Sequence, residues 1–171
     1  VNMLQHDKAL AENDYDKLAQ YLLRSLSNLK AAGAELAAIT ANTEHIVWNM
    51  VHSKFPLPVI SIVEATIREI KRKGFKNVLV FGTMFTLKSR LYENALNNQG
   101  ITAIIPSGND ISTIDSLIYP NMENGIIIPA DKQKLVKMAE KYISEKNADS
   151  ILLGCTELPL AITYCDVSVP I

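Results

Sequence analysis

Residues 150–159 read SILLGCTELP: a short apolar run ends in a glycine, and a cysteine, a threonine and a glutamate follow. Residues 36–45 read LAAITANTEH, where a strand-like run again turns into small polar residues and a Thr-Glu pair. Short apolar runs that end in turn residues are typical of buried parallel strands. The chain therefore contains two similar strand ends, and only the second has a thiol at the bend.

Strand-like and helix-like segments alternate along the chain. We expect helices between strands at residues 36–39, 59–62, 78–81, 101–105 and 151–153. A helix should also follow Gly82-Thr83 and continue until just before Gly100. The expected N-caps of three other helices, which end near residues 32, 54 and 145, are Asp14, Asn42 and Asp131. This alternation predicts an α/β fold in which parallel sheets are flanked by helices.

The composition excludes several classes of protein. Hydrophobic residues make up 48% of the 171 residues, too much for a disordered chain, and the net charge of −1 argues against a general nucleic-acid binder. No apolar run approaches the roughly 20 residues that span a membrane. Two cysteines do not suggest a disulfide scaffold, so we expect a reducing cytoplasm. The chain begins VNMLQHDKAL and ends DVSVPI, so we expect a piece of a larger fold.

Cys155 is the residue best placed for chemistry, because parallel sheets bind ligands outside the carboxyl ends of their strands. The helix expected to start there would favour a thiolate through its N–H groups and dipole, giving a nucleophile or a proton-transfer base. The alternative is a small buried hydrophobe. The small and polar neighbours Gly154, Thr156 and Glu157 favour the functional role, whereas Cys165 lacks such neighbours and is expected to be structural.

Two other signals are weak. GTMFTLKS at residues 82–89 nearly fits a phosphate-binding loop, but Leu87 stands where the second glycine is needed. His45 and His52 are seven residues apart with no acidic or cysteine partner at metal-ligand spacing, so no metal site is expected. We expect His45 to support the loop that precedes it.

Four stretches together resemble the aspartate/glutamate racemase superfamily, the cofactor-independent amino-acid racemases. LLGCTELPL (152–160) resembles the second-cysteine motif of that family, and ITANTEH (39–45) resembles the first motif, normally Cys-Asn-Thr followed one residue later by His. VLVFGTMFTLKSRLY (78–92) is similar to the family's strand and Gly-Thr loop, and LPVISIVEAT (57–66) to the segment between its halves. The order of these stretches agrees over nearly the whole chain.

The resemblance implies two pseudo-symmetric α/β half-domains with the active site in the cleft between them. One thiol from each half removes or returns the substrate's α-proton. On this basis residues 1–56 are a partial N-terminal half-domain and residues 57–171 the C-terminal half-domain. Aligning the two strand ends by sequence alone leaves either Ala41 or Asn42 opposite Cys155. The resemblance puts Ala41 at the place of the first thiol, so a two-thiol mechanism is not available as written.

The resemblance also implies the other site residues and the ligand. Expected substrate-binding residues, which would hold the α-carboxylate, are Asn42, Thr43, Thr83, Thr86 and Thr156, although helix capping is an alternative role for Asn42 and Thr86. Thr40 or Thr43 is an alternative source of the missing proton. We expect a homodimer that racemises aspartate or glutamate without a cofactor or a nucleic-acid partner. The alternatives are a single-cysteine decarboxylase of the same superfamily, a binding homologue without turnover, and an alanine introduced at position 41.

Overall fold

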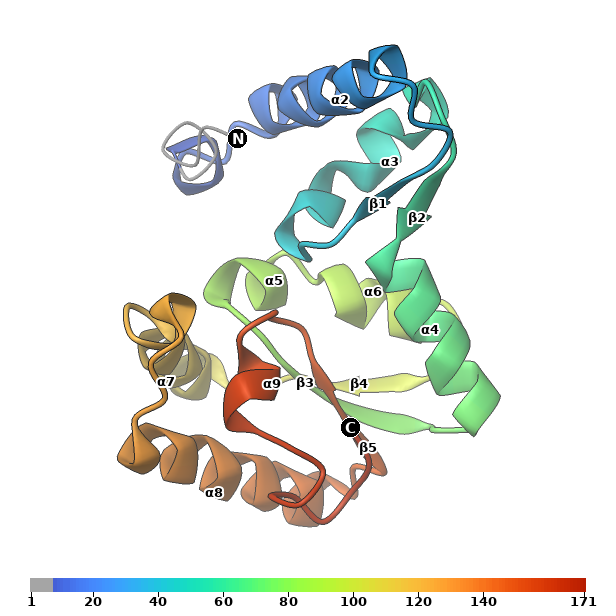
Figure 1. Ribbon diagram of the computed structural model, residues 1–171. Helices are drawn as coiled ribbons and strands as arrows, with labels where there is room; N and C mark the ends of the chain where they lie inside the picture. The colour runs from blue at the N-terminus through green and yellow to red at the C-terminus, as the bar shows by residue number, and fades with distance from the viewer. Residues whose placement is uncertain (1–7) are drawn as a thin grey trace. The chain divides into compact units, whose positions relative to one another are not determined.

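The computed structural model describes residues 8–171 and divides into two compact units (Figure 1). The first unit extends to Thr66, and the second comprises Ile67–Ile171. The helix α4 (Ile62–Lys73) begins in the first unit and continues into the second. The boundary between half-domains expected after residue 56 stays a prediction, since these units reflect the packing of this chain alone.

The first unit contains a long helix and a two-stranded parallel sheet. Its elements are α2 (Tyr15–Ala31), β1 (Ala37–Ile39), η1 (Thr43–Val47), α3 (Trp48–Val51), η2 (His52–Lys54) and β2 (Val59–Ser61). Asp14 caps α2 as expected, because its carboxylate accepts a hydrogen bond from the Lys17 N–H at 3.0 Å. Strand β1 pairs with β2 from Ala37↔Val59 to Ile39↔Ser61, so both strands end at the same level.

The helix expected after Asn42 differs from the prediction. It consists of three short pieces, η1, α3 and η2, and the Asn42 side chain makes no capping hydrogen bond to η1. A capping residue usually has an extended backbone, but Asn42 is itself in the right-handed helical region (φ −71°, ψ −44°). The predicted capping role of Asn42 is therefore wrong.

The second unit is built on a three-stranded parallel sheet in the order β4-β3-β5. Its elements after α4 are β3 (Asn77–Phe81), α5 (Met84–Lys88), α6 (Leu91–Asn97), β4 (Thr102–Ile104), α7 (Gly108–Ile118), η3 (Met122–Asn124), α8 (Pro129–Lys146), β5 (Ser150–Leu153) and α9 (Leu158–Ala161). Helix α8 covers one side of this sheet and α6 lies on the other (Figure 1). The predicted α/β fold with parallel sheets flanked by helices is confirmed.

Two helix predictions in this unit need correction. The helix expected from Thr83 to Gly100 is interrupted, because Arg90 adopts a left-handed conformation (φ +58°) between α5 and α6. Asp131 is not the N-cap of α8: the helix begins at Pro129, whose fixed φ suits a first helical position, and Ile128 is the N-cap. Asp131 instead lies in the first turn, where its charge complements the helix dipole.

The packing brings two loops together at the carboxyl edge of the sheet. Strands β3 and β5 are neighbours with Phe81 opposite Leu153, so the loops that follow them start at the same level. The Gly154 N–H donates to the Phe81 carbonyl at 2.6 Å and closes this edge. Among the described residues, no helix is both long enough and apolar enough to cross a membrane.

Candidate active site

Cys155 lies immediately after β5 on a tightly packed glycine. A Cβ at Gly154 would stand 3.0 Å from the Phe81 carbonyl oxygen and 3.2 Å from Cε2 of Tyr92, so only glycine fits there without movement. Close packing leaves the Cys155 residue just 6% exposed. Its thiol is therefore held in a fixed position at the carboxyl edge, where parallel sheets place their ligands.

The thiol of Cys155 donates a hydrogen bond to Oε2 of Glu157 at 2.9 Å. Burial raises the pKa of Cys155 to about 12, and the Glu157 carboxylate adds to this rise. The backbone N–H groups of Glu157 and Leu158 act in the opposite direction but are outweighed. The expectation of a thiolate favoured by a helix start is therefore wrong: α9 begins only at Leu158, and the thiol keeps its proton.

Glu157 accepts hydrogen bonds from two neighbours. Besides Cys155, the Thr156 hydroxyl donates to Oε2 of Glu157 at 2.7 Å. Burial works to raise the pKa of Glu157, but these two bonds and its own backbone N–H outweigh it and lower the pKa. The pair therefore consists of a neutral thiol and an ionised carboxylate that accepts its hydrogen bond. The sequence alone left the role of Glu157 undecided, although its place two residues after the cysteine was a signal for it.

The loop after β3 supplies the two predicted threonines. Oγ1 of Thr83 accepts from the Thr86 N–H at 3.4 Å and lies 3.2 Å from Oγ1 of Thr86, and both residues are buried. Thr83 thus caps α5, and Thr86 supports that cap. The next backbone N–H, that of Met84, donates to Oδ1 of Asp115 on α7 at 2.7 Å, which fixes the loop against that helix.

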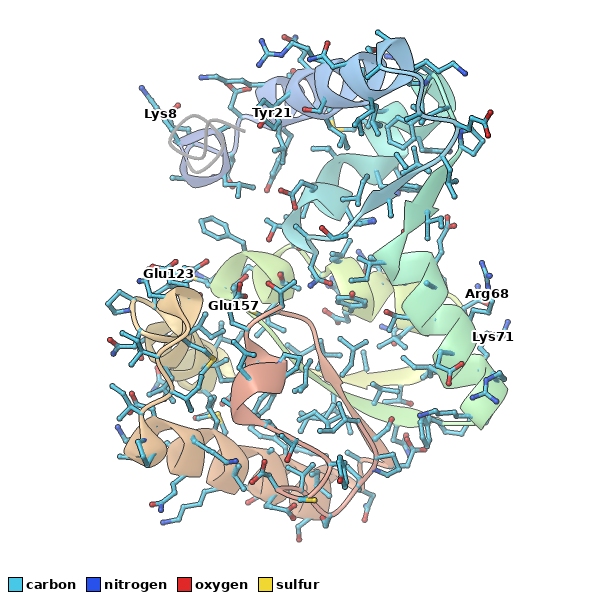
Figure 2. All side chains as sticks on the ribbon, in the orientation of Figure 1. Lys8, Tyr21, Arg68, Lys71, Glu123 and Glu157 are labelled. Atoms are coloured by element: carbon cyan, nitrogen blue, oxygen red, sulfur yellow. The ribbon has the colours of Figure 1, made fainter. Side chains whose placement is uncertain are left out.

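Negative charge gathers around Tyr119 in this unit. Burial raises the pKa of Tyr119 to about 12, and the carboxylates of Asp115, Glu123 and Glu157 contribute to the rise. Glu123 lies on η3, which packs against α9, and Glu157 lies just before α9 (Figure 2). Asp115, Tyr119 and Glu123 were not found from the sequence, because nothing in their local pattern indicates that they lie close to one another.

The first-motif residues belong to the other unit. Asn42 is buried, and Ala41 and Thr43 are half-buried. Ala41 and Asn42 lie between β1 and η1, and Thr43 is the first residue of η1. Nδ1 of His45 lies 3.1 Å from the Ala41 carbonyl oxygen, so this histidine supports the loop as expected. The structure brings Cys155, Thr156, Thr83 and Thr86 to one sheet edge, whereas participation of Asn42 and Thr43 in the same site stays a prediction.

Similarity to known proteins agrees with this arrangement. The family model described as Asp/Glu/Hydantoin racemase matches residues 6–171. The chain belongs to this racemase family. The resemblance found in the sequence is thereby confirmed at the level of the family, and within it the most similar proteins are amino-acid racemases or their homologues.

Three relatives illustrate the relationship. The chain is 25% identical over 158 residues to a broad-specificity amino-acid racemase of Bacillus subtilis, covering 92% of this chain and 67% of that enzyme. It superimposes with a TM-score of 0.83 and 32% identity on an aspartate racemase homologue from Pyrococcus horikoshii, over 95% of this chain and 72% of the other. A putative Asp/Glu racemase from Yersinia pestis gives a TM-score of 0.88 and 29% identity, over 99% of this chain and 74% of the other.

The chain spans only part of its curated relatives. It covers 67% of the length of the Bacillus enzyme. It covers 55% of a glutamate racemase of Aquifex aeolicus and 54% of one of Fusobacterium nucleatum. The fold and the family are therefore established for this chain, and the whole protein's activity and substrate are matters for proposal.

Proposed function

We propose that the protein racemises a small acidic amino acid, aspartate or glutamate, by cofactor-independent α-proton transfer at the thiol of Cys155. The observation that carries this proposal is a buried thiol at the carboxyl edge of the sheet, hydrogen-bonded to a carboxylate at 2.9 Å. Membership of the racemase family and relatives named glutamate racemase or aspartate racemase homologue support the substrate class.

The proton transfer proceeds without any change in oxidation state. When the α-C–H bond breaks, its electron pair stays on the substrate as a carbanion delocalised into the α-carboxylate, and an S–H bond forms on the thiolate. When the thiol returns a proton to the face that it serves, the S–H bond breaks and the C–H bond reforms with the original configuration. Inversion requires a proton on the opposite face of the carbanion. With Ala41 at the first-thiol position, we propose that Thr40 or Thr43 supplies this proton, directly or through a water, and that solvent restores it. Glu157 can take up the proton of Cys155 and give it back, so a neutral thiol beside a carboxylate serves both directions.

Hydroxyl groups are the proposed ligands of the substrate carboxylate. Thr83, Thr86 and Thr156 are grouped at one sheet edge, and the family pattern adds Asn42 and Thr43. The carboxylate of Glu157, which lies beside the Cys155 thiol and is only partly exposed, instead suits the substrate's α-ammonium group, because opposite charges attract. This negative environment favours an amino acid over a dianionic malonate.

A second candidate function is supported by Ala41, which the family pattern puts at the first-thiol position, and by the protonated state of Cys155. In a malonate-type decarboxylation the C–CO₂ bond breaks, CO₂ leaves, and its electron pair remains as a carbanion. A single thiol then delivers its proton to that carbon, and solvent restores the S–H bond. Such chemistry needs one thiol on one face only.

Proton NMR in D₂O with L- and D-aspartate and L- and D-glutamate tests the proposal. Exchange of the α-proton together with inversion supports a racemase, which then has a second base in place of the missing thiol. Exchange with retention of configuration means that the protein protonates only one face of the α-carbon. If none of the four isomers exchanges, the acidic-amino-acid racemase is ruled out, and release of CO₂ from aryl- or alkylmalonates becomes the next assay.

We also propose, from the family resemblance, that the protein acts as a homodimer in the cytoplasm. Light scattering after size-exclusion chromatography measures the assembly directly. A dimer gives twice the 18.9 kDa of one chain, and a mass of 18.9 kDa at micromolar concentration contradicts the proposal.

A further inference from the structure

His45 joins two loops of the first unit through both of its ring nitrogens. Nδ1 lies 3.1 Å from the carbonyl oxygen of Ala41, and the backbone N–H of Ile62 donates to Nε2 at 3.2 Å. The side chain belongs to η1 and the residue is 3% exposed. Its ring also stacks on Trp48, with 5.4 Å between ring centroids and 18° between planes.

These two contacts determine which nitrogen of the imidazole ring carries the proton. A backbone N–H can only donate, so Nε2 must present its lone pair to Ile62. A carbonyl oxygen can only accept, so Nδ1 must carry the hydrogen that is donated to Ala41. Both contacts are made together only by the neutral ring with its proton on Nδ1, because an imidazolium would direct an N–H at the N–H of Ile62.

The electrostatic surroundings favour the same state. Burial lowers the pKa of His45, and this effect outweighs the hydrogen bonds to the Ala41 and Asn42 backbone and the charges of Glu44 and Glu64, which all raise it. Among the described residues, these two carboxylates are the charged groups that act on the ring: Glu44 lies on η1 itself and Glu64 on α4. Helices α2 and α3 pack against η1 and contribute apolar side chains to the surrounding cluster.

The two residues joined by His45 have equivalent places in the sheet. Ala41 follows β1, Ile62 follows β2, and the two strands end side by side at Ile39↔Ser61. Ala41 directly precedes Asn42 and Thr43, to which the proposed function assigns carboxylate binding. His45 is thus a contact through which this loop is held to the start of α4.

We propose that neutral His45 is the positioning residue of the Ala41–Thr43 loop, tying it to the first residue of α4, and that protonation of the ring releases the loop. The catalytic consequence of this tie rests on the proposed function. When the ring gains a proton, Nε2 becomes an N–H group that faces the N–H of Ile62. Two donors cannot form a hydrogen bond, so this contact breaks. Acid therefore loosens the loop by protonating this ring.

Nitrogen NMR of the histidine rings tests the tie without any assay of activity. We expect His45 at pH 8 to show a protonated Nδ1 and an unprotonated Nε2. As the pH falls, the Ile62 amide resonance should move with the same midpoint as the His45 ring. A ring protonated on Nε2, or an Ile62 amide that does not respond while His45 titrates, would overturn the proposal.

Matched variants then test the consequence for the reaction. His45→Gln offers one donor and one acceptor but does not titrate, and His45→Leu offers neither. We expect His45→Gln to flatten the acid limb of kcat/KM for α-proton exchange, and His45→Leu to lower kcat/KM about tenfold at pH 8, the effect of losing one buried hydrogen bond. His52→Gln is the control, because His52 also stacks on Trp48 but is exposed.

The outcomes separate the two proposals. An unchanged acid limb in His45→Gln would overturn the positioning role, as would an equal change in His52→Gln. If the NMR result is as expected and the intact protein exchanges no α-proton of any amino acid, the tie is supported and the proposed function fails.

Discussion

At the scale of single residues, the site depends on a carboxylate placed beside a buried thiol. Cysteine thiols become reactive where positive groups or helix starts stabilise the thiolate, and Cys155 has the opposite surroundings. Burial and Glu157 both keep its proton in place, so the thiol in this state can deliver a proton. Abstraction of a proton then requires Glu157 to accept the thiol's own proton first.

Glu157→Gln is expected to lower the pKa of Cys155, because the neutral amide removes the negative charge that disfavours a thiolate. Burial remains, so the pKa should stay above that of a solvent-exposed cysteine. The rate of alkylation by iodoacetamide as a function of pH, followed by peptide mass spectrometry, measures this shift. Cys165 is exposed and is the internal reference for alkylation in the same sample. If the pH at which Cys155 reaches half of its maximal alkylation rate is the same in Glu157→Gln, Glu157 does not control the pKa of this thiol.

At the scale of secondary-structure elements, the close contact between β3 and β5 positions the thiol. Gly154 allows its N–H to reach the Phe81 carbonyl, and it leaves no room for a side chain between that carbonyl and Tyr92. The loops that carry Thr83 and Cys155 are adjacent for this reason. The geometry of the site is thus set by a glycine that has no chemical role.

Gly154→Ala is expected to lower the free energy of unfolding by about 1–3 kcal/mol, the usual cost of overpacking a core. Exchange activity should fall as well, because the Cys155 loop must move. Gly108→Ala is the matched control: a Cβ there has no neighbour within 4 Å, so a change within about 0.5 kcal/mol is expected. Urea unfolding of both variants makes the comparison, and equal effects would contradict the packing argument.

The sequence predicted the secondary-structure elements better than their exact ends and the side chains that surround the site. Buried apolar runs identified the strands, and Cys155 with its threonines followed from the positions of loops after strands. The break at Arg90 and the non-capping role of Asn42 depend on backbone conformations that no local pattern signals. The carboxylates of Asp115 and Glu123 come from α7 and η3, and only the tertiary packing brings them near Tyr119.

At the scale of the whole molecule, the stability should depend on pH in two separate windows. The pKa of His45 is lower in the folded protein than its ordinary value of 6.5, so the unfolded chain binds more protons as the pH falls below that value. Stability is therefore complete above about pH 6.5 and decreases as the pH falls toward the folded pKa. Asp166, with a pKa of about 2 against an ordinary 3.8, adds a loss only below about pH 4.

Urea unfolding of the intact protein and of His45→Gln between pH 8 and pH 4 isolates the first window. The difference in unfolding free energy between the two proteins should narrow as the pH falls below 6.5, because the titration of His45 is the one that the substitution removes. Asp166→Asn should leave that window unchanged and weaken the loss at lower pH. A difference between the intact protein and His45→Gln that stays constant with pH would show that His45 has the same pKa in both states.

The measurement that tests the central claim most directly compares the two cysteines in one assay. Deuterium incorporation at the α-carbon of aspartate and glutamate is followed in D₂O with the intact protein, Cys155→Ala and Cys165→Ala. We expect incorporation to be abolished in Cys155→Ala and unchanged in Cys165→Ala, whose cysteine is exposed. Incorporation that persists at the original rate in Cys155→Ala would contradict the assignment of this thiol as the proton carrier.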